Sequence, residues 1–255
     1  MKRLAQHIGL LAIAFMVAAP SVARADVVLM GSDYFETIPD TFFLPLTQPP
    51  LNLPSGALAG LPIGPGSTDT IVRRLDDCMI GMAVPGSQCV IPIEMVALSL
   101  VSVVNPMVVL RESPTQQSFG QMTIISDGSG SGGTFDSFFD IFVDLSIDGG
   151  MNFMLLGPPI HLESSGTSWT TQPQGIVVPG PVGDGEANLH VNPGVCAGLY
   201  AGMPCFDFFV AGQVTESHPL LGQHTARSAV PEPGTLALCG LALWLLARRR
   251  SRPQG

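Results

Sequence analysis

Residues 136–148 read Asp-Ser-Phe-Phe-Asp-Ile-Phe-Val-Asp-Leu-Ser-Ile-Asp, and this stretch decides the class of fold. Every second residue from Phe139 to Ile147 is apolar, and the aspartates all have the other parity. Such a period of two is typical of a β-strand with one buried face. The aspartates also recur every four residues, which fits a helix. The β-branched and aromatic side chains and the missing N-cap favour the strand. We interpret the acids as a solvated face rather than a cation site: Asp136, Asp140, Asp144 and Asp148.

Segments with similar properties occur on both sides of this stretch. The sequence Asp148-Gly149-Gly150 predicts a hairpin turn into residues 151–156. Residues 91–104 are largely apolar on both parities, which predicts a central strand buried between two layers. Connectors rich in Pro and Gly separate the strands, so we predict a mainly β fold, a β-sandwich-like domain over residues 26–229. The other predicted strands are 27–30, 70–75, 107–111, 121–125, 187–191 and 206–215, and the connectors are 47–66, 127–133 and 175–185.

The charge of this domain excludes one class of partner. Residues 26–230 contain four arginines and 19 of the 20 acidic residues, which gives a net charge of −15. A surface of this sign repels phosphate backbones, so nucleic-acid binding is not expected. The acidity is compatible with solubility outside the cell, with divalent cations or with a neutral polysaccharide.

The first 25 residues have the pattern of a secretory signal helix. Lys2 and Arg3 precede an apolar run at residues 8–19, and Pro20 ends that run. Twelve helical residues span about 18 Å, too little for a bilayer core of about 30 Å, so an uncleaved anchor is disfavoured. Signal peptidase is therefore a predicted partner, and its predicted cleavage site consists of Ala23, Ala25 and Asp26.

The opposite end of the chain combines three features in a fixed order. A rigid segment, Val230-Pro231-Glu232-Pro233, is followed by an uncharged apolar run at residues 236–247 and then by Arg248, Arg249 and Arg250. An arginine cluster after an apolar helix stays in the cytoplasm, so the domain before it faces outward. We predict a short transmembrane helix within residues 230–252, and a precursor that is anchored in the inner membrane and faces the periplasm.

This C-terminal segment resembles the PEP-CTERM sorting domain of Gram-negative bacteria. The resemblance covers about a tenth of the chain and implies cleavage near Pro231-Glu232-Pro233 by an exosortase, a membrane-embedded processing enzyme. It also implies association with exopolysaccharide and biofilm, at the cell surface or in the extracellular matrix. A glycolipid-anchor signal is the alternative, but signals of that type end without a basic cluster.

Four cysteines lie in the exported part and a fifth, Cys239, lies in the apolar run. Four cysteines allow three pairings, and we predict the two local ones because each would close a short loop containing Gly and Pro. An oxidising periplasm permits them. Zinc binding is the alternative, but no Cys-x-x-Cys or Cys/His spacing is present. The predicted disulfides are Cys78–Cys89 and Cys196–Cys205.

No pattern in the chain indicates catalysis, a cofactor or a metal. The Gly-rich residues 127–132 lack the acids of a calcium loop, and a predicted strand follows where a dinucleotide site needs a helix. A Ser/His/Asp site would have to be assembled from dispersed residues, since no nucleophile elbow occurs. Its histidines would come from His161, His190, His218 and His224. The aromatic residues that sugar rings could contact are Trp169, Tyr34, Tyr200, Phe138 and Phe142, although packing in the fold explains them equally well.

Three hypotheses for the function follow. The first is a non-enzymatic surface or matrix protein that is sorted through its Pro-Glu-Pro tail. The second is a carbohydrate-binding module that acts on the exopolysaccharide, with Trp169 as the test residue. The third is a secreted hydrolase, which requires a histidine within hydrogen-bond reach of a serine and a carboxylate.

Overall fold

The computed structural model describes residues 25–38, 41–43, 61–173, 187–190, 194–196, 198–218 and 222–228. Nearly all regular structure in these residues is β, as the sequence predicted. The elements are β1 (Asp26–Val28), β2 (Gly31–Thr37), β3 (Phe42–Phe43), β4 (Leu61–Arg74), β5 (Cys78–Ile80), β6 (Gln88–Ser102), β7 (Val109–Glu112), β8 (Ser118–Ser126), β9 (Gly132–Ile141), β10 (Val143–Ser146), β11 (Met154–Leu155), β12 (Ile160–Thr170), β13 (Gly194–Val195), the 3-10 helix η1 (Gly198–Tyr200), β14 (Pro204–Phe206), β15 (Phe209–Val210), β16 (Gln213–His218) and β17 (Gly222–Ser228).

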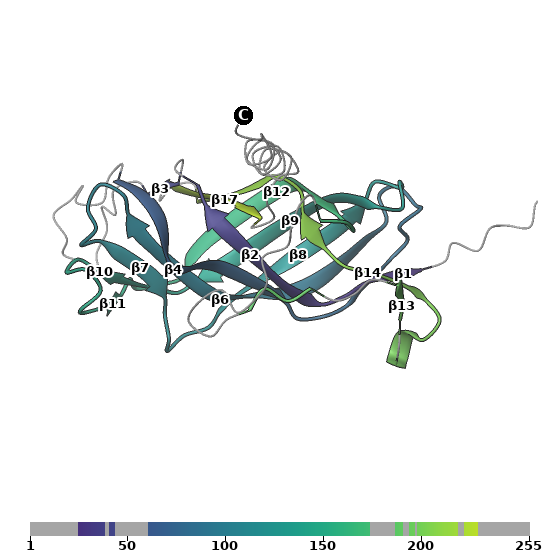
Figure 1. The fold of residues 1–255 in the computed structure, drawn as a ribbon, viewed down its shortest axis with the longest axis horizontal. Coiled ribbons are helices and arrows are strands. Elements are labelled where there is room, and N and C mark those ends of the chain that lie inside the picture. The colour runs from purple at the N-terminus through teal and green to yellow at the C-terminus, as the bar shows by residue number, and fades with distance from the viewer. Residues whose placement is uncertain are drawn as a thin grey trace, which may run out of the picture.

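Eight of these strands form a closed barrel rather than two packed sheets. The antiparallel order is β6-β8-β9-β12-β16-β17-β2-β4, and β4 pairs again with β6 to complete the circle (Figure 1). The predicted sandwich is therefore wrong. β4 and β6 are the longest strands, with 14 and 15 residues, and their pairing carries register shifts between Pro65 and Thr70 and between Ile71 and Val72. Irregularities of this kind bend and twist a sheet, which lets it curl onto itself.

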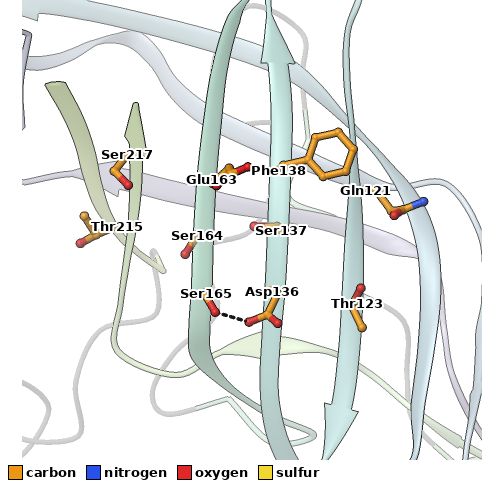
Figure 2. A pocket seen from close by; sticks show the side chains of 10 residues that line it. All are labelled: Gln121, Thr123, Asp136, Ser137, Phe138, Glu163, Ser164, Ser165, Thr215 and Ser217. Carbon is orange, nitrogen blue, oxygen red and sulfur yellow. Dashed lines mark hydrogen bonds between the residues drawn. The ribbon is translucent and has the colours of Figure 1, made fainter. Parts of the chain in front are cut away.

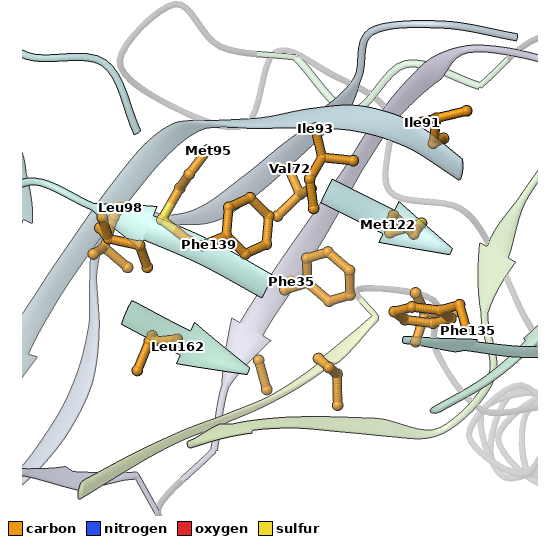
Figure 3. Close-up of a cluster of buried hydrophobic side chains, with 14 of the residues drawn as sticks. Phe35, Val72, Ile91, Ile93, Met95, Leu98, Met122, Phe135, Phe139 and Leu162 are labelled. Atoms are coloured by element: carbon orange, nitrogen blue, oxygen red, sulfur yellow. The ribbon is translucent and has the colours of Figure 1, made fainter. Parts of the chain in front are cut away.

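The inward side chains fill the barrel with a continuous apolar core. Phe35 from β2 and Phe135 and Phe139 from β9 lie among methionine and aliphatic side chains (Figure 3). β6 contributes alternate residues, and its outward Val90 is 53% exposed. The prediction that residues 91–104 are buried on both faces is wrong, because β6 lies in a single curved sheet with one side toward solvent.

The stretch that decided the fold class divides into two strands. β9 keeps the expected alternation, with Phe139 and Ile141 buried. At Phe142 the chain leaves this ladder, and its N–H donates to Ser118 Oγ at 3.0 Å. In β10 the prediction of a solvated acid is wrong, because Asp144 is 8% exposed and pairs with Arg111 at 3.2 Å.

The predicted hairpin after β10 is confirmed. β11 pairs with β10 in antiparallel register. Asp148 Oδ1 accepts hydrogen bonds from the N–H groups of Met151 and Asn152, at 3.0 and 2.9 Å, and these bonds hold the turn. Ile147 was predicted on the buried face, but it is 48% exposed at the start of this loop.

A small sheet, β13-β14-β1-β5, lies at one end of the barrel (Figure 1). Both predicted disulfides are present and hold this region together. Cys78–Cys89 joins β5 to β6, and Cys196–Cys205 closes the β13–η1–β14 segment. The predicted pairing is therefore confirmed.

Both predicted processing segments fall largely outside the described residues. Ala25 and Asp26 of the signal cleavage site are described, and Asp26 begins β1. Within the part of the chain that the structure describes, no helix has the length and apolar character needed to cross a membrane. The predicted residues that lie outside it are Ala23, Val230, Pro231, Glu232, Pro233, Arg248, Arg249 and Arg250.

Candidate functional site

An open groove of about 400 Å³ lies on the outside of the barrel, where β8, β9, β12 and β16 run side by side (Figure 2). Strand register explains its composition. Phe138 lies between Gln121 and Glu163, and Glu163 is opposite Ser217 on β16. These side chains therefore form one row across four strands. The lining residues are Gln121, Thr123, Asp136, Ser137, Phe138, Glu163, Ser164, Ser165, Thr215 and Ser217.

The groove is hollow because two neighbouring strands separate there. β12 shifts register between Ser164 and Thr167, and Gly166 between them has a φ of 68°, a conformation that favours glycine. Among the described residues, β12 and β16 share a single register pair, Glu163 with Ser217. The floor of the groove therefore contains Ser164 and Ser137, which have the inward parity of their strands and are 7% and 8% exposed.

Hydrogen bonds to carboxylates hold the polar side chains of the groove and its rim in position. Asp136 Oδ1 accepts hydrogen bonds from Ser165 Oγ at 2.8 Å and from the Gly166 N–H at 2.7 Å. His161 lies between two carboxylates, with Nδ1 2.7 Å from Asp140 Oδ1 and Nε2 3.1 Å from Glu163 Oε1. The hydrogen bond to Asp140, and after it the one to Glu163, raises the pKa of His161, because both favour the protonated ring.

The groove combines hydroxyl, amide and carboxylate groups with one aromatic ring. Phe138 lies among them, and its ring centroid is 5.4 Å from that of His161. Polar groups that donate and accept hydrogen bonds beside an aromatic ring match the chemistry of a sugar, which has many hydroxyls and an apolar face.

Of the five aromatic residues singled out from the sequence, only Phe138 lines this groove. Trp169 is 2% exposed and stacks on Phe208, with ring centroids 5.2 Å apart. It is a core residue and cannot serve as a sugar platform. Tyr200 packs against the Cys196–Cys205 region, while Tyr34 on β2 and Phe142 between β9 and β10 are partly buried.

His224 lies beside a hydroxyl and a carboxylate, but the hydroxyl donates its proton to a different carboxylate, so the three groups are not arranged for catalysis. His224 Nε2 is 2.9 Å from Thr37 Oγ1, and His224 Nδ1 is 3.3 Å from Glu216 Oε2. The Thr37 hydroxyl donates to Asp69 Oδ1 at 2.5 Å, so it has no proton to give to His224. The residues are buried inside the barrel, where the two cavities that His224 lines hold about 20 Å³ each, room for one water. This geometry does not form a nucleophilic site.

A second histidine belongs to a buried charged cluster at the end of the barrel, which we call the Arg74 cluster: Arg74, Asp33, Asp207 and His190. The Arg74 Nη1 donates to Asp33 Oδ2, and Nη2 lies 3.8 Å from Asp207 Oδ1. His190 Nδ1 is 3.1 Å from Asp207 Oδ2. Burial raises the pKa of Asp33, although the Arg74 charge opposes this shift. The cluster connects β2 and β4 with the chain after β14, so its role is structural.

The other two histidines singled out from the sequence form no catalytic or metal-binding site among the described residues. His161 lies at the rim of the groove, and His218 ends β16. Among the described residues, no set of three His, Cys, Asp or Glu side chains is arranged to hold a metal ion.

Comparison with known proteins identifies a sorting motif in the C-terminal segment. The family profile described as the PEP-CTERM protein-sorting motif matches residues 229–251. The chain carries a PEP-CTERM sorting motif. The resemblance seen in the sequence is therefore confirmed, and the PEP-CTERM motif indicates sorting to the cell surface by an exosortase-type enzyme after transient anchoring in the membrane. Neither the curated proteins nor the solved structures contain a match to this chain.

Proposed function

We propose that this is an exported, non-enzymatic protein of the cell surface or extracellular matrix, and that its barrel binds exopolysaccharide in the outer groove. The observation that carries this proposal is the groove itself. It places an aromatic ring within a 400 Å³ hollow whose other lining groups are hydroxyls, amides and carboxylates. The PEP-CTERM motif supports the cellular location, because it directs a protein to the surface.

The groove favours binding over hydrolysis. A glycosidase needs a carboxylic acid that stays protonated near neutral pH, and burial is the usual way to achieve this. The Glu163 side chain is 72% exposed, so it is not shielded from water in this way. Asp136 Oδ1 already accepts hydrogen bonds from Ser165 and Gly166, which tie this carboxylate to the turn in β12. Neither residue has the surroundings of a general acid.

The processing that we propose is consistent with the positions of the first and last strands. Cleavage by signal peptidase after Ala25 would leave Asp26 as the new N-terminus, and β1 begins at that residue. Exosortase would then act near Pro231-Glu232-Pro233, after β17 has ended at Ser228. The precursor would face the periplasm from the inner membrane until this second cleavage.

Affinity electrophoresis of the processed protein, in gels containing exopolysaccharide from the producing strain, tests the binding role. We expect the polysaccharide to retard the wild type. We expect Phe138→Ala to weaken binding by about three- to tenfold, since an aromatic contact contributes about 0.5–1.5 kcal/mol. Val90→Ala is the matched control, because Val90 is equally outward but lies on β6 outside the groove. Unretarded wild-type protein, or equal retardation of both variants, would contradict the proposal.

A further inference from the structure

We propose that the groove selects a polysaccharide that carries free amino groups, a cationic amino-sugar polymer, over neutral and uronic-acid polymers. This inference rests on the proposed carbohydrate-binding function and names the class of glycan. It comes from the charges around the groove, from one hydroxyl on its floor and from the position of the Phe138 ring.

The groove and its rim contain three carboxylates, Asp136, Asp140 and Glu163, and no lysine or arginine. His161 is the one other ionisable side chain there, and it bridges Asp140 and Glu163. With His161 protonated, the site still has a net charge of about −2. A uronate polymer would bring more negative charge to this surface, whereas an ammonium group would find carboxylate partners.

Among the residues that the structure describes, the arginines are not free to bind an anionic glycan. Residues 26–228 contain four arginines and no lysine. Each of these arginines already pairs with an acid, and Arg74 is completely buried. The other three pairs are Arg73–Glu94 at 3.5 Å, Arg111–Asp144 at 3.2 Å and Arg227–Glu36 at 3.0 Å. A bidentate arginine contact to a carboxylated sugar is therefore not available without breaking an existing pair.

The floor of the groove contains a hydroxyl without a protein partner. Ser137 is 92% buried, since its exposed fraction is 8%, and no described residue forms a hydrogen bond with its Oγ. Because this Oγ is not one of the fully enclosed side-chain oxygens, it borders the open space of the groove, where a hydroxyl or amine of a ligand can become its partner. In Figure 2 Ser137 lies on β9 beside Ser164 of β12, its register partner. This observation is independent of the charges, and it points to a ligand with hydroxyl or amine groups.

The strand register places carboxylates on both sides of a sugar that stacks on Phe138. Glu163 is directly opposite Phe138, which corresponds to a Cβ–Cβ distance of about 5 Å. Asp136 precedes Phe138 by two residues on the same face, about 7 Å along the strand. An amino group on the stacked ring, or on the next ring along the chain, therefore reaches a carboxylate in either orientation.

Titration calorimetry with defined oligosaccharides tests this inference on the processed wild-type protein. The probes are an oligomer of glucosamine, its N-acetylated counterpart and an oligouronate, each at low and at high salt. We expect the glucosamine oligomer to bind about three- to tenfold more tightly than the acetylated one, as two exposed ion pairs would provide. We also expect salt to remove this preference, because exposed charges are screened.

Three variants separate the contribution of the carboxylates from that of the aromatic ring. Glu163→Gln and Asp136→Asn should abolish the preference while leaving the acetylated oligomer bound, whereas Phe138→Ala should weaken both. Asp76→Asn is the matched control, because Asp76 is an exposed acid in the turn after β4, outside the groove. If Asp136→Asn disturbs the Gly166 turn and fails to fold, Glu163→Gln alone decides the question.

The outcomes distinguish the two proposals. Equal affinity for both glucosamine oligomers, or tighter binding of the uronate, would overturn the selectivity and leave the carbohydrate-binding function standing. Failure of the exopolysaccharide and of every oligosaccharide to bind would overturn both.

Discussion

Replacing Arg74 by methionine tests whether the Arg74 cluster holds the end of the barrel together. The side chain is 0% exposed, and its partners Asp33 and Asp207 are 4% and 1% exposed. Its guanidinium also lies 4.8 Å from the centre of the Phe208 ring. Methionine fills a similar space but leaves two buried carboxylates without their arginine. Breaking a buried ion pair in this way costs about 3–5 kcal/mol in free energy of unfolding. For a domain of this size, about 4 kcal/mol corresponds to a fall in Tm of about 8–16 °C.

The neighbouring residue supplies the control. Arg73 is on the same strand with the opposite parity, and its side chain is 43% exposed and 3.5 Å from Glu94. Because exposed pairs contribute at most about 1 kcal/mol, Arg73→Met should change the free energy of unfolding by less than this. Denaturant unfolding at neutral pH, followed by circular dichroism, measures both. If the two variants were destabilised equally, the Arg74 cluster would not have the role assigned to it.

The pH dependence of the Arg74→Met variant gives a second check. Burial raises the pKa of Asp33 and the Arg74 charge opposes this shift, so without the arginine Asp33 takes up a proton more readily and the loss of stability should shrink as the pH falls. A loss that stays constant between neutral and acidic pH would indicate that packing, rather than charge, is responsible.

Three further predictions follow from the structure. Gly120→Ala should lower the free energy of unfolding by about 2 kcal/mol, because its Cβ would lie 1.9 Å from the Phe138 carbonyl oxygen. Gly81→Ala is the control, because its Cβ would meet side-chain atoms of Ser87 and Val84 at 3.2 and 3.3 Å, and equal unfolding midpoints in urea would disprove the prediction. Replacing both Cys196 and Cys205 by serine should cost up to about 3 kcal/mol, as the loop they close spans nine residues, and an unchanged Tm in non-reducing buffer would contradict it. Asp69 and Asp148 should act in opposite directions when stability is measured against pH. Burial raises the pKa of Asp69, so its contribution is present below 3.8 and lost as the pH rises through the raised pKa, and Asp69→Asn should remove that loss. Hydrogen bonds from Asn152 and Ser146 lower the pKa of Asp148 to about 2, so its contribution is lost as the pH falls from 3.8 toward 2, and a wild-type slope in Asp148→Asn over that range would refute the assignment.

The sequence predicted the β class, the disulfides and the sorting motif because each has a local signal. It did not predict β12 or β17, whose inward faces include polar side chains such as Ser164 and His224. Alternation of apolar and polar residues cannot reveal a strand whose buried face is itself partly polar. Barrel closure also has no local signal, since inward and outward residues alternate in the same way in a sandwich and a barrel. Only the pairing of β4 with β6 distinguishes them, and the first residues of β4 were assigned to a connector.

The candidate site was even harder to predict from the sequence than the fold. Its residues come from four strands and are mostly serines and threonines, and none of them belongs to a sequence motif that the chain displays. Phe138 was singled out from the sequence because it is an aromatic residue with the outward parity of its strand. The separation of β12 from β16 that makes the groove concave depends on tertiary structure, so it could not be predicted.

The position of β17 has a consequence for how the protein is made. Thr37 on β2 and His224 on β17 are 187 residues apart, yet these two strands are neighbours in the closed circle. A chain that is translocated from its N-terminus therefore exposes an unpaired strand edge until almost the whole polypeptide has crossed the membrane. The last strand ends one residue before the matched sorting motif begins. A proteolytic cut inside the motif releases an intact barrel, whereas a cut only a few residues upstream would open it.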